Sequence, residues 1–492
     1  MTKPSIVLIY PDTMNNRSDL IPPLSLIHVG APLMGDFDVR IIDMRIDDDW
    51  RGTLTAALSA GNVLCVGVST MTGPQIKGAC EAAAIVRSAA PSVTIAWGGV
   101  HPSLLPEQTI RSELMDVIVV GDGEETFREL VTALAGGDDI GEIKGLVFKR
   151  GSEIVTTPKR GQTKIDPRVI DAYELLDMEA YKANPAWTET ESLPFITSRG
   201  CPHRCGYCYN TEFCSRRWTA LTAEETVDSM LELSRRYGIR GIFLLDDNFF
   251  VNTRRVRRIA ELLVESGVGL SIYNGNCRAD TLAQMDEGLL RLLKRAGFDQ
   301  LFIGVESGSD EILERIGKDI TVDDVMAASA KLKRVGIRPF YSFMAGFPFE
   351  TAEHVKDTLR LMHALLRENP NAIVYRLQLY TPFPGTELYR YALSLGMPFP
   401  ETLEGWASYH YDEIGKGGFP LEHRRLLEDL HFYTAYLDKK LSAGRSPVLR
   451  MVSHLLSDML RLRIRHNALS HMVELQPFKL GQKIRNRRLG KC

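Results

Sequence analysis

The sequence lacks features that would assign it to several common classes of protein. No apolar run approaches the ~20 residues that a membrane-spanning helix needs. Of eight cysteines, only three are clustered, and this is not the framework of a disulfide-rich secreted protein. The net charge of −3 excludes a basic surface over the whole chain, so we expect no nucleic acid as a partner.

Targeting signals are also missing from the sequence. The N-terminus runs directly into a strand-like segment, without the basic start and long apolar stretch of a signal peptide. The last residue, Cys492, does not fit the C-a-a-X frame for prenylation. We therefore expect a reducing compartment, the cytoplasm. The 492 residues, 44% of them hydrophobic, suggest a globular protein of about two to four domains.

The N-terminal part, residues 1–158, alternates β-rich apolar segments with helical patterns such as 74–91. This alternation predicts a doubly wound α/β domain, in which a parallel sheet is covered on both faces and the ligand site lies at the carboxyl ends of the strands. A predicted hairpin at 145–158 ends the domain, and 159–190 resembles a linker. The expected parallel strands are 5–11, 38–44, 63–70, 93–99 and 116–124.

A second series of strands and helices occupies residues 191–390. Six β-rich segments separated by helical patterns predict an incomplete parallel (β/α)6 barrel, with its active site at the carboxyl ends of the strands. Residues 391–492 are mainly helical and are expected to form a cap that shapes substrate choice. The expected barrel strands are 194–198, 241–247, 270–280, 300–307, 337–348 and 374–385.

Three cysteines follow the first of these barrel strands in a C-x3-C-x2-C frame, at Cys201, Cys205 and Cys208. A zinc site is one interpretation, with Cys214 as the fourth ligand, because His203 is too close to its neighbours to complete a tetrahedron. The other interpretation is a four-iron cluster, in which three thiolates leave one iron open to a chelating substrate. We favour the cluster.

The cysteine spacing, its place after the first barrel strand and the aromatic Tyr207 resemble the radical S-adenosylmethionine superfamily. The resemblance implies a [4Fe-4S] cluster on Cys201, Cys205 and Cys208, whose open iron binds S-adenosylmethionine. Reductive cleavage then gives a 5′-deoxyadenosyl radical, with electrons from a donor such as flavodoxin or ferredoxin. Cys214 falls outside the motif.

Later strand ends also resemble the family's binding segments for S-adenosylmethionine. The segment 244–250 lacks the common Gly-Gly-Glu form at the second strand, while 304–313 closely resembles the fourth-strand motif. The guanidinium of Arg278 suits a carboxylate through its fork of donors. Besides Tyr207 and Arg278, the expected contacts to S-adenosylmethionine are Asp246, Asp247, Asn248, Glu306, Ser307, Gly346 and Pro382.

The N-terminal domain has no G-x-G-x-x-G or Walker fingerprint, so a nucleotide cofactor is disfavoured. Its loops at 69–72, 97–107 and 121–127 resemble the cobalamin-binding domain fused to many radical S-adenosylmethionine enzymes. The D-x-H-x-x-G motif is missing, so we predict that no protein histidine ligates cobalt, and we interpret His28 as a surface or structural residue. The expected cobalamin contacts are Ser69, Thr70, Gly98, Gly99, His101, Gly121 and Glu124.

Together these resemblances predict a cobalamin-dependent radical methyltransferase. It would use the 5′-deoxyadenosyl radical and methylcobalamin to methylate an unactivated carbon or phosphorus of a small molecule, natural product or lipid. Two alternatives stay open: a non-methylating radical enzyme like the anaerobic Mg-protoporphyrin monomethyl ester cyclase, and a metal-stabilised binding protein without turnover. No catalytic residue is assigned.

The segment 446–475 has apolar residues at helical spacing, with Arg461, Arg463 and Arg465 clustered. We interpret these arginines as the solvated face of a packed helix. Contact with an anionic substrate, a partner or a membrane surface is the alternative.

Overall fold

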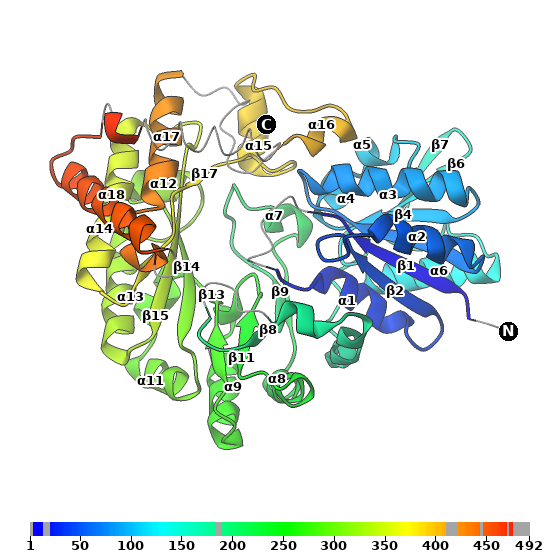
Figure 1. Ribbon diagram of the computed structural model, residues 1–492, viewed down its shortest axis with the longest axis horizontal. Coiled ribbons are helices and arrows are strands. Elements are labelled where there is room, and N and C mark those ends of the chain that lie inside the picture. Colours follow the sequence, from blue (N-terminus) through cyan, green and yellow to red (C-terminus); the bar gives the residue numbers. More distant parts are fainter. Residues whose placement is uncertain are drawn as a thin grey trace.

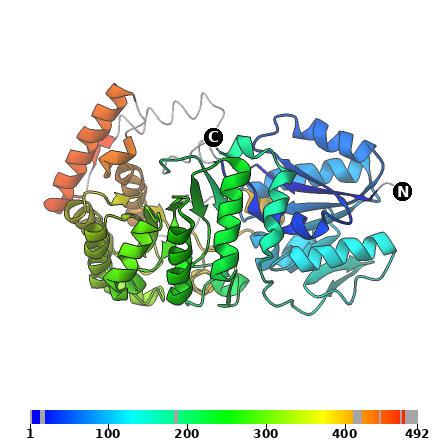
Figure 2. The same ribbon diagram turned by 90° about the horizontal axis from the view of Figure 1, so that it is seen from below.

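The computed structural model describes residues 3–12, 20–182, 188–409, 421–442, 446–469 and 472–475, so Cys492 lies outside the described residues. The N-terminal domain, in blue and cyan, occupies one end of the molecule, and the barrel, in green and yellow, lies beside it (Figure 1). The last helix lies at the far end of the barrel in both views (Figures 1 and 2).

The N-terminal sheet has seven strands in the order β2-β1-β3-β4-β5-β6-β7. The first five pair in parallel, and β6 and β7 form the antiparallel hairpin, as the sequence predicts. The strands are β1 (Ser5–Tyr10), β2 (Asp38–Asp43), β3 (Val63–Ser69), β4 (Thr94–Gly98), β5 (Val117–Val119), β6 (Leu146–Arg150) and β7 (Glu153–Thr156).

Alternate side chains of β1 enter two different cores, which is why its sequence is apolar without interruption. Ile6 and Leu8 belong to the core that includes α1 and α6, whereas Val7 and Ile9 belong to the core that includes α2 and α3. The sheet is therefore covered on both faces, as predicted. The helices are α1 (Leu24–Gly30), α2 (Trp50–Ser59), α3 (Gln75–Ala89), α4 (Val100–Leu104), α5 (Pro106–Ile110) and α6 (Glu124–Gly136), with the 3-10 turn η2 (Ala31–Leu33).

The segment between the domains, which the sequence analysis treats as a linker, packs tightly where it is described. It forms the 3-10 turns η3 (Pro167–Leu175) and η4 (Met178–Tyr181). The hydroxyl of Tyr173 donates to the carbonyl of Pro194 (2.7 Å), and that of Tyr181 donates to Asp43 (2.8 Å). This segment thus connects the first barrel strand to the N-terminal sheet through one continuous core.

All the barrel strands pair in parallel, which confirms the predicted barrel. The predicted third strand is divided at Asn274, whose φ of 59° interrupts the extended backbone, and the sixth is also divided into two. The strands are β8 (Ser192–Phe195), β11 (Gly241–Leu244), β12 (Ser271–Tyr273), β13 (Gly275–Cys277), β14 (Gln300–Glu306), β15 (Arg338–Ala345), β16 (Ile373–Val374) and β17 (Gln378–Leu379).

Local sequence signals set the limits of the barrel helices. In α8, Thr222 and Glu225 form a capping box at the N-terminus, and Gly238 ends the helix in the left-handed conformation. The helices are α8 (Ala223–Tyr237), α9 (Thr253–Ser266), α10 (Ala279–Gln284), α11 (Glu287–Arg295), α12 (Asp310–Arg315), α13 (Val322–Val335) and α14 (Ala352–Glu368), with the 3-10 turn η5 (Phe249–Val251).

A small antiparallel pair that the sequence does not predict lies beside the cysteine loop. It consists of β9 (Ser198–Gly200) and β10 (Trp218–Ala220), with the short helix α7 (Asn210–Phe213) between them. The pair closes the ends of residues 201–217 against each other and so fixes the base of the cysteine loop.

The C-terminal elements divide between the two domains. The indole of Trp406, on α16, is buried in the core of the N-terminal domain and donates to Gln108 (2.6 Å), while α18 packs against α14. No helix among the described residues is long and apolar enough to cross a membrane. The elements are α15 (Glu387–Ser394), α16 (Leu403–Ala407), α17 (Leu421–Thr434), η6 (Lys439–Ser442), α18 (Pro447–Arg465) and η7 (Val473–Leu475).

Candidate active site

A cavity of about 1380 Å³ lies between the N-terminal domain and the barrel. It is larger than the pockets of about 300–1,000 Å³ that usually hold small ligands. One wall comes from the carboxyl ends of the N-terminal strands and from α1, and the other from the residues around the cysteine loop. Such a cavity suits a large cofactor together with a second reactant.

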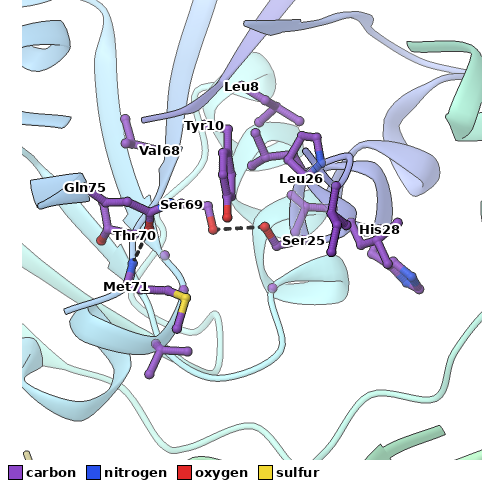
Figure 3. Close-up of a pocket in the computed structure, with 18 of the residues that line it drawn as sticks. Leu8, Tyr10, Ser25, Leu26, His28, Val68, Ser69, Thr70, Met71 and Gln75 are labelled. Atoms are coloured by element: carbon purple, nitrogen blue, oxygen red, sulfur yellow. Dashed lines mark hydrogen bonds between the residues drawn. The ribbon is translucent and has the colours of Figure 1, made fainter. Parts of the chain in front are cut away.

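The N-terminal wall contains six of the seven residues predicted as cobalamin contacts: Ser69, Thr70, Gly98, Gly99, Gly121 and Glu124. Figure 3 shows part of this wall, where Ser69 and Ser25 share a hydrogen bond (3.1 Å) beside Tyr10. Gly99 has a φ of 93°, and a Cβ there would lie 2.6 Å from the carbonyl oxygen of Thr70. Only glycine allows this close approach of two strand ends.

Five buried polar atoms of this wall have no hydrogen-bond partner: Thr70 Oγ1, Gln75 Nε2, Trp97 Nε1, His28 Nε2 and Glu124 Oε2. Buried polar atoms are destabilising unless they are hydrogen-bonded, so their presence on one wall points to a ligand with many polar groups. The amide-bearing rim of a corrin meets this requirement. Gln75 and His28 were not predicted as contacts, because their position depends on how α3 and α1 pack.

His101 does not line the cavity, unlike the other predicted cobalamin contacts. It is fully buried, its Nδ1 lies 3.1 Å from the hydroxyl of Thr72, and its ring centroid lies 5.9 Å from that of Trp406. Burial lowers the pKa of His101 to about 4, so the imidazole is neutral. The structure therefore places its side chain beside Trp406 of α16, while its backbone amide donates to the carbonyl of Thr70 (3.2 Å).

A buried charged cluster joins the two walls. Arg199, two residues before Cys201, forms ion pairs with Glu124 and Asp122 and donates to Nδ1 of His28 (2.7 Å). Burial, together with the charge of Arg199, lowers the pKa of His28 to about 3. Burial raises the pKa of Glu124, but the nearby positive charge outweighs it and the pKa ends below its usual value. The sequence analysis missed Arg199, whose partners are distant in sequence.

The same contact fixes the tautomer of His28. A guanidinium only donates hydrogen bonds, so Nδ1 of the neutral imidazole is the acceptor and Nε2 carries the proton. A protonated Nε2 is a hydrogen-bond donor and not a metal ligand. His28 is therefore a buried hydrogen-bond donor in the cavity wall, and the absence of a histidine ligand on cobalt stays a prediction.

The backbone holds the cysteine loop in place from several directions. The amide of Gly200 donates to Asp247 (2.6 Å), and the amide of Gly206 donates to the carbonyl of Ile316 (2.8 Å). Gly200 has a φ of 80°, and a Cβ there would lie 2.1 Å from the carbonyl oxygen of Arg217. The loop is thus built for one conformation.

The three motif thiols lie in this loop at the carboxyl end of β8. Burial raises the pKa of Cys201, and it raises the pKa of Cys208 to about 12. Such thiols lose their protons when a metal binds them. Among the described residues, no group of three His, Cys, Asp or Glu side chains is placed to hold a metal ion. Cys214 donates to the amide oxygen of Asn210 (3.4 Å) and lines the cavity, apart from the motif.

The acids after β11 hold the base of the cysteine loop. Asp246 is fully buried and accepts hydrogen bonds from the amide (2.8 Å) and hydroxyl (2.7 Å) of Thr197. Burial raises its pKa to about 6. Asp247 lines the cavity and also accepts from Asn210 (2.6 Å), and the amide of Asn248 lies 3.9 Å from the sulfur of Cys201.

A buried cluster of Tyr207, Glu306 and Lys318 lies next to the same loop. Glu306 Oε1 accepts from Lys318 Nζ (2.9 Å) and from the hydroxyl of Tyr207 (3.1 Å). Glu306 has a φ of 72°, a left-handed conformation that non-glycine residues adopt mainly at functional sites. The sequence analysis missed Lys318, because only the fold brings the loop after α12 back to the end of β14.

The remaining predicted contacts of S-adenosylmethionine lie on other strand ends. Arg278 is buried and donates to the carbonyl of Asp319 (2.9 Å). Ser307 Oγ lies 3.3 Å from the hydroxyl of Thr358, and the carbonyl of Pro382 accepts from Tyr409 (2.9 Å). The amide of Gly346 donates to Glu350. Of all the residues predicted for the metal and for S-adenosylmethionine, only Asp247 lines the large cavity.

Two family models match the chain: the Radical SAM superfamily over residues 195–362 and the B12 binding domain over residues 12–131. An uncharacterized methyltransferase of Pyrococcus horikoshii, PH0819, is 31% identical over 398 residues, which cover 79% of this chain and 83% of that protein. The chain therefore belongs to the family of cobalamin-binding radical S-adenosylmethionine enzymes.

Other relatives are named for different activities, a cyclisation and a methylation. The anaerobic magnesium-protoporphyrin IX monomethyl ester cyclase of Synechocystis is 27% identical, over 75% of this chain and 72% of that protein. The hopanoid C-3 methylase of Methylococcus capsulatus is 23% identical, over 75% and 68%. The structure of the radical S-adenosylmethionine methyltransferase TsrM from Kitasatospora setae, with cobalamin and a [4Fe-4S] cluster bound, has a TM-score of 0.70 at 18% identity. It covers 91% of this chain and 90% of that one.

These comparisons confirm the predicted family, fold class and set of cofactors: a [4Fe-4S] cluster, S-adenosylmethionine and cobalamin. The protein is a radical S-adenosylmethionine enzyme in a family of cobalamin-dependent methyltransferases. The residues that hold each cofactor, and the limits of the domains, stay predictions.

Proposed function

We propose that the protein transfers a methyl group to an unactivated carbon or phosphorus of a small-molecule, natural-product or lipid substrate. When bound, the cluster and S-adenosylmethionine supply the 5′-deoxyadenosyl radical, and cobalamin supplies the methyl group. The observation that carries the proposal is the shared cavity, whose walls are the expected cobalamin wall and the barrel face beside the cysteine loop. A substrate between them would face both.

The barrel side would hold the radical-generating group. Cys201, Cys205 and Cys208 would bind the cluster, in a loop fixed by Asp247 and its partners. Lys318 and Arg278 are buried cations near this loop, suited to the carboxylate of S-adenosylmethionine. Asp246, Asn248, Tyr207, Glu306, Ser307, Gly346 and Pro382 complete the proposed site.

The N-terminal side would hold cobalamin. Ser69, Thr70, Gly98, Gly99, Gly121 and Glu124 line the wall, and we add Gln75 and His28 because each presents a buried donor without a partner. The amides around a corrin would satisfy these donors. His101 is left out of the proposed contact set because it does not line the cavity.

The products of S-adenosylmethionine test the proposal against its alternatives. The protein is reconstituted anaerobically with iron, sulfide and cobalamin, and then given a strong reductant and S-adenosylmethionine. A methyltransferase yields both S-adenosylhomocysteine and 5′-deoxyadenosine, whereas a cyclase-like enzyme yields 5′-deoxyadenosine alone. Formation of neither product, with zinc bound in place of iron, would indicate a metal-stabilised binding protein and refute the proposal.

The electron donor, the cellular compartment and the domain boundaries are also part of the proposal. Reductive cleavage of S-adenosylmethionine needs an electron donor, for which flavodoxin or ferredoxin is our proposal. Free cluster thiols favour a reducing compartment such as the cytoplasm. We keep the boundaries 1–158, 191–390 and 391–492 for the three domains, with the qualification that 159–190 packs against both neighbours where it is described.

A further inference from the structure

The last long helix, α18, carries apolar side chains on two opposite faces. One face is buried and contributes Ser453, Leu456, Ser457, Leu460 and Ile464 to the packing against the barrel. The other face is exposed to solvent. A helix packed on a domain usually presents polar residues outward, so the outer face of α18 needs a separate explanation.

Six large apolar side chains of α18 are exposed by between 41% and 66%: Val448, Leu449, Met451, Leu455, Met459 and Leu462. They make up half of the twelve exposed large apolar side chains in the described chain. Five of the six recur every three or four residues, at 448, 451, 455, 459 and 462, and so form one stripe along the helix. Exposed apolar patches of this kind mark interaction sites.

Positive charge accompanies the stripe. Arg450 and Arg465 are exposed on α18, on the side of the stripe next to His454 and Arg461. Its acidic residue, Asp458, forms an ion pair with Lys439 (2.6 Å). In the sequence, residues 476–492 add six lysines and arginines and no acidic residue. An apolar stripe with basic neighbours matches the surface of an anionic bilayer.

We propose that α18 docks the protein on anionic phospholipid membranes, with its apolar stripe in the interface and its basic residues against the headgroups. The helix lies at the end of the molecule farthest from the N-terminal domain in both views, so docking leaves that domain clear of the membrane (Figures 1 and 2). This inference does not depend on the proposed methyl transfer. It adds the membrane surface to the proposed partners of the protein.

Vesicle co-sedimentation tests the docking with two matched variants. Leu455→Glu with Leu462→Glu places two charges in the stripe, where both leucines are 57% exposed. Val268→Glu with Leu395→Glu makes the same change at residues 53% and 54% exposed, which lie in the loops after α9 and α15. Because all four side chains are largely exposed, neither variant disturbs the core.

We expect wild type and the Val268→Glu/Leu395→Glu variant to bind vesicles of phosphatidylcholine mixed with phosphatidylglycerol. Binding should fall with added salt and be weak on phosphatidylcholine alone. The Leu455→Glu/Leu462→Glu variant should bind about tenfold less. Absence of wild-type binding, or equal binding by both variants, would overturn the proposal. So would a wild-type dimer in sedimentation velocity that only the α18 variant converts to a monomer, because the stripe would then join two copies.

Discussion

The two walls of the cavity differ in how their buried polar groups are satisfied. On the barrel wall, Asp247 accepts hydrogen bonds from Gly200 and Asn210, and behind it Lys318 neutralises Glu306. On the N-terminal wall, Thr70 and Gln75 keep polar atoms that are buried and have no partner. These barrel-side groups are paired with one another, whereas the Thr70 and Gln75 atoms of the N-terminal wall are not.

We infer that the two walls differ in this way because one supports a metal cluster and the other binds a large organic cofactor. A loop that holds a cluster by three thiolates must have one conformation before the metal arrives, so its supporting acids are already hydrogen-bonded. A wall that binds a large amide-rich cofactor needs donors and acceptors that are still available. Unpartnered atoms weaken the empty protein and strengthen the complex, because the ligand supplies the missing hydrogen bonds.

Replacing the cluster ligands should have the largest effect. Alanine at Cys201, Cys205 or Cys208 removes one of three thiolates, and we expect each variant to lose the visible absorption of the reconstituted cluster. Cys214→Ala is the matched control and should keep that absorption, because its thiol bonds to Asn210. A normal absorption band in all three motif variants would refute the assignment.

Arg199→Met should break the contact between the walls. It leaves Glu124 buried without its cation, and losing one partner of a buried ion pair destabilises a protein by about 4 kcal/mol. Arg204→Met is the control in the cysteine loop that follows: its pair with Asp319 is exposed, so its loss should change stability far less. Thermal unfolding of the metal-free protein measures both. Adding Glu124→Gln should restore part of the loss, and equal effects of the two arginine variants would contradict the account.

Glu350 is an exception on the barrel side, because its Oε1 is buried without a partner while the other oxygen accepts from Gly346. Burial raises the pKa of Glu350 to about 7. The unfolded chain, with a pKa near 4.5, therefore loses this proton first, and the folded state loses stability as the pH rises from about 4.5 to 7.

Glu350→Gln should remove up to about 3 kcal/mol of this pH dependence, since glutamine stays neutral and can still accept from Gly346. The check is the thermal midpoint of both proteins at several pH values. The two should agree at the acidic end and separate toward neutral pH, with the variant more stable. Parallel curves would show that the carboxyl group is not buried.

Thr70→Val tests the N-terminal wall and should have the smallest effect. Removing an unpartnered hydroxyl should stabilise the empty protein by about 1 kcal/mol and weaken cobalamin binding by roughly fivefold. Thr109→Val is the control, since the hydroxyl of Thr109 is buried but donates to Leu105 (2.7 Å). That variant should lose stability and keep its affinity for cobalamin, as measured by titration. If both variants gained stability, or both lost it, the contrast between paired and unpaired hydroxyl groups would be contradicted.

The sequence predicted well what short segments determine. The order of the strands, the hairpin and the C-x3-C-x2-C motif depend on neighbouring residues, and the glycines at strand ends reached the cavity as expected. Contacts between distant segments could not be predicted. Arg199 pairs with Glu124 of α6, and Lys318 pairs with Glu306 of β14. Trp406 of α16 bonds to Gln108 of the N-terminal domain. For the same reason, the sequence could not show that the side chain of His101 packs beside Trp406 and not in the cavity wall.

Formation of 5′-deoxyadenosine by the anaerobically reconstituted protein tests the central claim most directly. With iron, sulfide, cobalamin, a strong reductant and S-adenosylmethionine, we predict that 5′-deoxyadenosine accumulates in the wild type and in Cys214→Ala, and that it is absent in Cys205→Ala. Equal amounts in all three proteins, or none in the wild type, would contradict the assignment of Cys201, Cys205 and Cys208 as the site of radical formation.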